Sequence, residues 1–426
     1  MLSLRWAPKS KFKTGSPRRL RVQFFKDLSL STVTAGFVSV LVGVASSIAI
    51  VFQAALSFGA TPEMLASWLW AIGIGMGLTT LGPSLWLRKP VMVAWSSSGA
   101  AVLASAGATG NFSMGEAIGA FMLSGGVIFV IGASGWFERI MRLMPMSLAS
   151  ALLAGVLAGF CLTGFAAAQT DLALVLVMLA AYLLGRRLVP LYAVLICLGA
   201  AVIYTALTHG FGAQPIPAGL TVPVFVAPVF TWSAAVSLAL PLFIVTMASQ
   251  NMPGVAAIKA CGFGDERANG GDAGIPITKI LTLTGAATVV LAPFGAFQLN
   301  LSAITAAMCM GPQAHPDPAR RYTAAVSCGA IYVVVGLFGA TIMGALLAFP
   351  KPLVVAIAGL ALLSTVATAL STALQDSSER EAAIITFLVT LSGVVIAGIG
   401  SAFWGLLAGV CAMLIQHARR GTALRF

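Results

Sequence analysis

Long apolar runs recur along the whole chain, separated by short polar connections. A helix that crosses the hydrocarbon core of a bilayer needs about 20 apolar residues, and most of these runs are long enough for one crossing. The chain is 59% hydrophobic and only 8% charged, whereas about 25% of the residues in a soluble domain are charged. The sequence therefore predicts an all-α polytopic membrane protein and excludes a soluble enzyme or a nucleic-acid-binding protein.

The apolar runs form two sets of seven, separated by the uncharged, Pro- and Gly-rich stretch 208–230. The runs lie near 30–57, 65–84, 90–108, 116–135, 146–168, 171–185 and 189–207, and then near 231–258, 275–291, 293–310, 322–349, 352–374, 382–398 and 400–417. Because seven is odd, the second set enters the membrane from the opposite side. We therefore expect 14 transmembrane segments as a 7+7 inverted repeat, the arrangement of many secondary transporters.

If successive segments cross the membrane in alternating directions, the basic residues of the connecting loops fall on one side. Lys and Arg are enriched in cytoplasmic loops, and eight of them lie in the first 26 residues. Only Lys351 falls clearly on the other side. The pattern predicts a multi-pass protein of the bacterial inner membrane with both termini in the cytoplasm. The expected units are a cytoplasmic tail, a first repeat, a periplasmic loop, a second repeat and a cytoplasmic tail, at 1–29, 30–207, 208–230, 231–418 and 419–426.

The third and tenth segments begin with stretches that do not read as helix, Pro90–Gly99 and Pro293–Ser302. Each predicts a short extended piece followed by a half-helix, with Ser98 and Asn300 as N-caps. Irregular backbone at membrane depth is tolerated only inside protein or beside a water-filled cavity. Two half-helix N-termini would offer N–H groups and partial positive charge to an anion. We therefore expect a site for a carboxylate or a similar polar solute.

Polar residues and aromatic rings near these breaks are the candidate ligands, together with matching positions in the first and eighth segments. In the eighth segment Pro253 leaves a backbone carbonyl free. The predicted substrate-binding residues are Ser46, Ser47, Gln53, Trp95, Ser96, Ser97, Ser98, Gly99, Ser249, Gln250, Asn251, Gly295, Phe297, Gln298, Asn300 and Ser302. The alternative reading is that the polar groups only join helices and that Trp95 and Phe297 are core or lipid-facing rings.

The sequence predicts no catalytic residue, metal site or cofactor. Its six cysteines are scattered singly, without the paired spacing of a zinc site. All twelve carboxylates and the three histidines fall in predicted loops or near the ends of segments, although intramembrane proton relays normally use such groups. We therefore expect any proton to move with the substrate, or through a site reached from the cytoplasmic ends.

Several motifs resemble the benzoate:proton symporter (BenE) family over nearly the whole chain. They are TAGFV at 34–38, VFQAA at 51–55, PVMVAWS at 90–96, MASQNMPG at 247–254, and AITAA at 303–307 leading to HPDPARRY at 315–322. The resemblance implies import of benzoate or a related aromatic carboxylate together with a proton. More distantly, it implies the uracil-permease architecture, which is often dimeric. That architecture has a core domain of segments 1–4 and 8–11 and a gate domain of segments 5–7 and 12–14, with the site in segments 1, 3, 8 and 10.

Two departures bear on the substrate. Ser97 and Ser98 stand where the family motif continues with Thr-Pro, and Gln250 and Phe297 stand where related nucleobase permeases place glutamates. We expect a secondary transporter that works by alternating access, with the aromatic ring against Trp95 and Phe297 and the carboxylate toward the half-helix N-termini. The alternatives are a permease for another small organic anion or a nucleobase, a channel, or a membrane-embedded enzyme.

Overall fold

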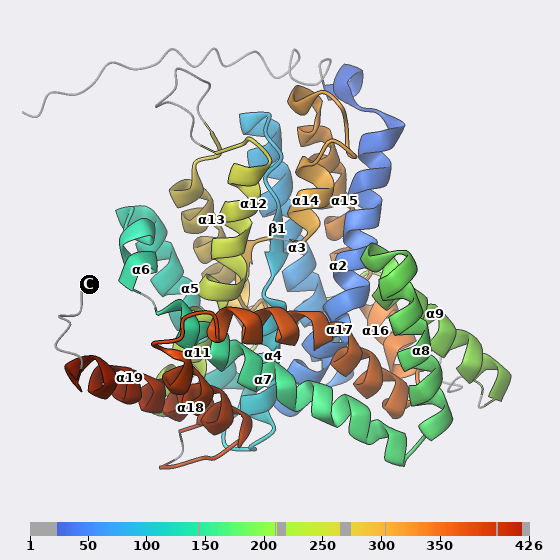
Figure 1. Ribbon diagram of the computed structural model, residues 1–426. Coiled ribbons are helices and arrows are strands. Elements are labelled where there is room, and N and C mark those ends of the chain that lie inside the picture. Colours follow the sequence, from blue (N-terminus) through green and yellow to red (C-terminus); the bar gives the residue numbers. More distant parts are fainter. Residues whose placement is uncertain are drawn as a thin grey trace, which may run out of the picture.

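The structure, a computed structural model, describes residues 24–143, 145–208, 210, 219–264, 274–302, 304–397 and 399–419. Most of the N-terminal basic tail and residues 420–426 therefore lie outside the described residues. Within the described ranges the protein is mostly helical, with one two-stranded sheet (Figure 1). The predicted all-α membrane class is confirmed at this level.

The first half contains eight α-helices and one strand in the described residues. They are α2 (Leu30–Ser57), α3 (Pro62–Leu87), β1 (Val93–Trp95), α4 (Ser97–Gly107), α5 (Met114–Ser134), α6 (Phe137–Leu143), α7 (Met146–Ala166), α8 (Leu172–Leu188) and α9 (Ala193–Thr208). Local sequence sets several starts. Ser29 and Ser113 form capping boxes with Thr32 and Glu116, because their hydroxyls satisfy N–H groups that have no partner within the helix.

The second half begins with one long, irregular helix. It runs through α10 (Trp232–Ala234), η3 (Ala235–Ala239), α11 (Leu240–Thr246), η4 (Met247–Asn251) and α12 (Met252–Ala260). The segments η3 and η4 are π-helical, and each lies just before a proline, Pro241 or Pro253. Proline removes a helical N–H, and the wider π-turn, which is frequent at functional sites, absorbs that break.

The remaining elements include one further strand. They are α13 (Ile277–Leu291), β2 (Leu299–Leu301), α14 (Ile304–Met310), α15 (Tyr322–Leu337), α16 (Gly339–Leu347), α17 (Lys351–Ala373), α18 (Arg380–Leu391) and α19 (Ser401–Arg419). The apolar run near 322–349 is not one straight helix, because α15 and α16 meet at 67°. A side chain at Gly339 would lie 2.9 Å from the carbonyl oxygen of Ala66, so this bend brings the chain directly onto α3.

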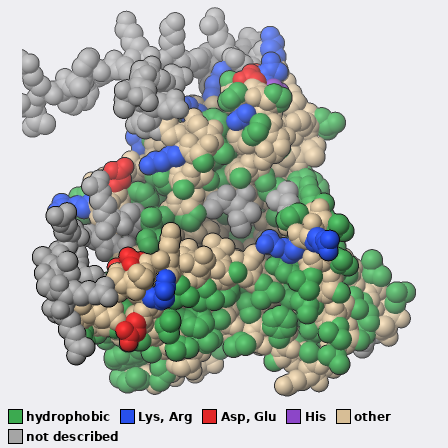
Figure 2. All heavy atoms as spheres, viewed as in Figure 1, with side chains coloured by type: hydrophobic (Ala, Val, Ile, Leu, Met, Phe, Trp, Pro, Cys, Tyr) green, Lys and Arg blue, Asp and Glu red, His purple; other side chains and the backbone are tan. Residues whose placement is uncertain are grey.

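Six described helices are long and apolar enough to cross a membrane. They are Pro62–Leu87, Met114–Ser134, Met146–Gln169, Trp232–Ala260, Ile277–Phe294 and Lys351–Ala373, and two bent pairs raise the number to at most eight. Large apolar side chains such as Val130, Leu183 and Leu207 are exposed, and hydrophobic side chains cover most of the lower half of the face in Figure 2. A multi-pass membrane protein follows from this surface.

The helices pack in corresponding pairs from the two halves of the chain. α3 packs against α15 and α5 against α13, while α7 packs against α17. The helices α8 and α9 form one neighbouring pair, and α18 and α19 form another. In Figure 1, α3, α12, α13, α14 and α15 lie in the upper part of the view with β1, whereas α7, α8, α17, α18 and α19 lie in the lower half. α3 packs against both strands, and α13 and η4 pack against β2. The sheet is thus enclosed by helices from both halves.

Candidate functional site

The two predicted extended pieces meet in the middle of the protein. β1 and β2 pair antiparallel, with Ala94 opposite Asn300 and Trp95 opposite Leu299. The pairing continues beyond the strands, because the Ser96 N–H donates to the carbonyl oxygen of Gln298 over 2.9 Å. Each piece thereby satisfies backbone groups of the other, which makes non-helical chain tolerable away from water.

Side chains from three surrounding elements satisfy the outer edges of these strands. Thr80 of α3 accepts from the Val93 N–H at 3.1 Å, and Thr288 of α13 accepts from the Leu299 N–H at 3.1 Å. On the same strand as Leu299, the Leu301 N–H donates to the side-chain oxygen of Asn251 in η4 at 3.0 Å. Sequence reasoning missed Thr80 and Thr288, whose signal was a hydroxyl inside an apolar helical run.

The first half-helix is capped by a different serine from the one predicted. Ser96, not Ser98, is the N-cap of α4, and its Oγ accepts from the Gly99 N–H at 2.9 Å. The reason is that β1 already ends at Trp95, which leaves Ser96 in the extended conformation of an N-cap. The hydroxyl of Thr246 also donates to Ser96 Oγ at 2.9 Å.

The side chain of Ser98 is instead hydrogen-bonded to the long irregular helix and thereby joins α4 to it. Its Oγ accepts from Ser249 Oγ at 2.9 Å and from Gln250 Nε2 at 3.1 Å. Both donors belong to the π-helical segment η4, so this segment contacts the first turn of the half-helix α4. The structure thus brings the third and eighth predicted segments together through predicted residues. Ser97 and Gly99 lie in the first turn of α4.

Asn300 is not an N-cap either, because it lies in the centre of β2 and α14 begins four residues later, at Ile304. Its Nδ2 donates to the Leu301 carbonyl at 3.0 Å. Ser302 shares a hydrogen bond with Thr305 through their hydroxyls. The extended piece is simply longer here than the sequence predicts, since strand pairing with β1 holds it.

The two predicted aromatic residues have separate surroundings. Trp95 is 4% exposed and its Nε1 donates to Ser47 Oγ of α2 at 2.8 Å. Phe297 is fully buried, with its ring centroid 6.0 Å from that of Trp68 and 6.3 Å from that of Phe121. No described ring contact joins Phe297 to Trp95. Gly295 faces the Trp68 ring, so it supports the same aromatic cluster.

Three predicted residues carry buried polar atoms without a hydrogen-bond partner among the described residues. They are Gln298, through both Oε1 and Nε2, Asn300, through Oδ1, and Gln53, through Nε2. Gln298 and Asn300 are fully buried and two residues apart in an extended chain, so they lie on one face of it. Each unmade hydrogen bond of this kind costs about 1–3 kcal/mol. Such groups in a native protein call for an explanation, and a bound ligand or water is one.

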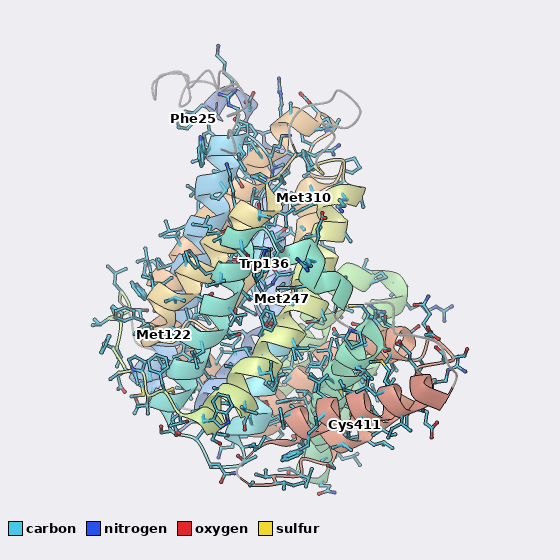
Figure 3. The ribbon with its side chains drawn as sticks, turned by 90° about the vertical axis from the view of Figure 1, so that its left-hand side faces the viewer. Phe25, Met122, Trp136, Met247, Met310 and Cys411 are labelled. Atoms are coloured by element: carbon cyan, nitrogen blue, oxygen red, sulfur yellow. The ribbon has the colours of Figure 1, made fainter. Side chains whose placement is uncertain are left out.

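Charge is almost absent from this region. Among the described residues no Asp or Glu is buried, and Arg321 is the buried charged side chain. Its guanidinium donates to the carbonyl oxygens of Met310, His315 and Pro316 at 3.0, 2.8 and 3.2 Å. Figure 3 places Met310 toward the end of the molecule that carries Phe25, and Met247 of η4 nearer the middle. Arg321 therefore binds carbonyl groups at the end of α14 and is not part of the middle of the molecule. This role was not predicted from the sequence.

Neither of two surface pockets is lined by a predicted site residue. One, of about 540 Å³, is lined by residues that include Phe25, Arg88 and Tyr322, and the other, of about 840 Å³, by residues that include Met122 and Trp136 (Figure 3). The side chain of Ser46 lies outside the described residues. Within the described ranges no three His, Cys, Asp or Glu side chains are grouped to hold a metal ion.

A family model and two known relatives match nearly the whole chain. A family model described as "Benzoate membrane transport protein" matches residues 26–415. The chain is 42% identical over 386 residues to "Inner membrane protein YdcO" of Escherichia coli (strain K12), covering 90% of this chain and 96% of that protein. It is 35% identical over 390 residues to "Benzoate membrane transport protein" of Acinetobacter baylyi (strain ATCC 33305 / BD413 / ADP1), covering 92% and 96%.

Solved transporter structures share the fold at low sequence identity. The structure of SLC26A9 aligns with a TM-score of 0.57 at 12% identity, covering 95% of this chain and 68% of that one. The transmembrane domain of the cyanobacterial bicarbonate transporter BicA aligns with a TM-score of 0.52 at 14% identity, covering 92% and 98%. The chain therefore shares the fold of these structures.

Proposed function

Because the chain belongs to the benzoate membrane transport family, we propose that it imports benzoate or a related aromatic carboxylate by alternating access together with a proton. It is a membrane transport protein and not an enzyme. The observation that carries the site is the β1–β2 pair with its unpartnered amides at Gln298 and Asn300. These groups lie on the paired strands of the third and tenth segments, to which Asn251 of the eighth segment is hydrogen-bonded, and they offer hydrogen bonds that the described protein does not use.

In the proposed binding mode the carboxyl group lies at the start of α4 and beside the amides of β2. Ser98, Ser249 and Gln250 already form a hydrogen-bonded group there. The substrate ring packs on the indole of Trp95, which Ser47 holds in place. Phe297 serves as support through its contacts with Trp68 and Phe121. The other predicted ligands remain proposals.

We also propose the finer architecture of 14 segments as a 7+7 inverted repeat with both termini in the cytoplasm. Support comes from the corresponding helix pairs, in which α3 with α15 mirrors α13 with α5. The proposed core domain contains α2 to α5 and α10 to α16, and the proposed gate domain contains α7 to α9 and α17 to α19. A homodimer is a further proposal, which rests on the family resemblance alone.

A second candidate is a different small anion. It is favoured by the fold shared with a structure described as a bicarbonate transporter and with an anion transporter. A nucleobase is less favoured, because Gln250 and Phe297 stand where related permeases place carboxylates.

A substrate-competition experiment separates these candidates. Radiolabelled benzoate is trapped by counterflow in proteoliposomes that hold the purified protein, with unlabelled benzoate, bicarbonate or uracil inside. We expect exchange with benzoate only, and loss of exchange in Asn300→Ala and Gln250→Ala but not in Gln375→Ala, whose side chain is exposed. Failure of internal benzoate to trap labelled benzoate, together with counterflow of labelled bicarbonate or labelled uracil in the same proteoliposomes, would refute the proposed substrate.

A further inference from the structure

The amide of Gln298 has an unusual environment for a buried polar group. The residue is fully buried, and neither Oε1 nor Nε2 has a hydrogen-bond partner among the described residues. Its main chain is held, because the Gln298 carbonyl accepts from the Ser96 N–H. Two residues further along the same face, Asn300 Oδ1 is also unpartnered. The site therefore presents two free acceptors and a free donor.

This set of atoms distinguishes the two protonation states of a carboxyl group. A neutral carboxylic acid offers one O–H donor and one carbonyl acceptor, whereas an ionised carboxylate only accepts. A primary amide offers an acceptor and a donor side by side, so it forms two hydrogen bonds with the acid. A carboxylate would leave Gln298 Oε1 and Asn300 Oδ1 facing further acceptors, in a region where an unpaired buried charge is costly.

Nothing described nearby compensates an anion with a full positive charge. The guanidinium of Arg321 is engaged with three carbonyls at the end of α14, and the Gly99 N–H of the α4 terminus already donates to Ser96 Oγ. The elements packed against β2 are β1, α3, α13 and η4. Their charged residues are Glu63 on α3 and Lys279 on α13, both exposed.

Resting on the proposed function, we propose that the substrate crosses as the neutral carboxylic acid, with its COOH group paired to the amide of Gln298 and with Asn300 Oδ1 as a second acceptor. The anion takes up one proton outside to form the acid, and the acid releases one proton and the anion inside. One proton thus accompanies each anion without net charge transfer and without a protein carboxylate. This accounts for a proton-coupled transporter with no buried Asp or Glu among its described residues.

The test is the pH dependence of ligand binding by the purified full chain in detergent. Benzoate is compared with a ring-substituted benzoate whose own pKa is about one unit lower. We expect the apparent Kd for total acid to rise about tenfold per pH unit above the ligand's pKa, and the midpoint to shift with the ligand. Benzamide, a neutral donor and acceptor, should compete at every pH, and benzenesulfonate, which stays ionised, should not.

Several outcomes would overturn the proposal. A midpoint common to both acids would assign the proton to a protein group, and binding that is independent of pH or blocked by benzenesulfonate would assign the anion as the bound form. Either result leaves benzoate as the substrate. Absence of binding of both acids at every pH by folded protein would instead refute the proposed function, and this inference with it.

Two variants separate recognition from folding. Gln298→Met keeps the side-chain volume but removes the amide, so we expect binding of benzoate and benzamide to weaken by about tenfold or more while Tm is unchanged or higher. Gln375→Met, on an exposed residue, is the matched control and should bind normally. A lower Tm with undiminished binding in Gln298→Met would show a merely structural amide and contradict the proposal.

Discussion

At the scale of single residues, hydroxyl and amide side chains determine how non-helical chain is held inside the protein. Asn251 shows this most clearly, because its oxygen accepts from the Leu301 N–H at 3.0 Å while its Nδ2 lies 3.3 Å from the Met247 sulfur. Asn251 is fully buried. Its side chain therefore links η4 to β2 through a buried hydrogen bond.

We predict that Asn251→Ala destabilises the protein by about 1–3 kcal/mol, the usual cost of a buried donor left without its acceptor. The measurement is unfolding in detergent micelles, with Asn111→Ala, at an exposed position, as the control. Equal stability of the two variants would show that the bond to Leu301 contributes nothing.

The sequence predicts which residues lie near the site better than it predicts what each side chain does there. The sequence places Ser96, Ser98, Ser249 and Gln250 among the candidate ligands, and the structure joins Ser98 to Ser249 and Gln250, whereas Ser96 bonds to Thr246. It does not reveal that Ser96 is the cap, because the end of β1 depends on pairing with a strand about 200 residues away. Nor does it separate Phe297 from Trp95, since each ring's neighbours come from different helices.

At the scale of elements, α14 is a very short helix whose end is fixed from outside. It spans Ile304–Met310, and a helix of this length is marginal by itself. The buried Arg321 donates to three carbonyls at and beyond its end. A cation at this end also interacts favourably with the helix dipole. The motif HPDPARRY at 315–322 therefore has a structural purpose in positioning α14.

We predict that Arg321→Met lowers the stability of α14, because hydrogen bonds from a charged donor contribute about 1.5–3 kcal/mol each. Hydrogen exchange of residues 304–310 should accelerate, and Tm should fall. The matched control is Arg320→Met, whose partner Asp317 is 3.7 Å away at the surface, where such pairs contribute about 0–1 kcal/mol. Unchanged exchange in Arg321→Met would contradict this role.

The elements themselves followed closely from the apolar runs, with exceptions that have tertiary causes. The run near 322–349 is divided by the bend between α15 and α16, which depends on the approach of Gly339 to α3. The π-helical turns η3 and η4 accompany prolines visible in the sequence. Their exact form depends on packing, so composition alone does not give it.

At the scale of the whole molecule, import in one direction requires a fixed orientation of the protein in the membrane. The charge pattern places Lys351 on the periplasmic side and Arg187 on the cytoplasmic side, and both side chains are exposed. The described helices include six long enough to span, so the full segment count rests on the charge pattern and the repeat.

We predict opposite labelling of single-cysteine variants made in a background without the six native cysteines. In intact cells a membrane-impermeant maleimide should label Lys351→Cys but label Arg187→Cys only after permeabilisation. The reverse pattern would show that the proposed topology is inverted. Labelling of both variants in intact cells would place both residues on the same side, which excludes an odd number of membrane crossings between them.

Proton-coupled import of an aromatic carboxylate can be measured as gradient-driven uptake. Radiolabelled benzoate is presented to proteoliposomes of the full chain with an inward proton gradient, with no gradient, and with the gradient collapsed by a protonophore. We expect accumulation above equilibrium only with the intact gradient. Uptake by folded protein that is the same under all three conditions would contradict proton coupling.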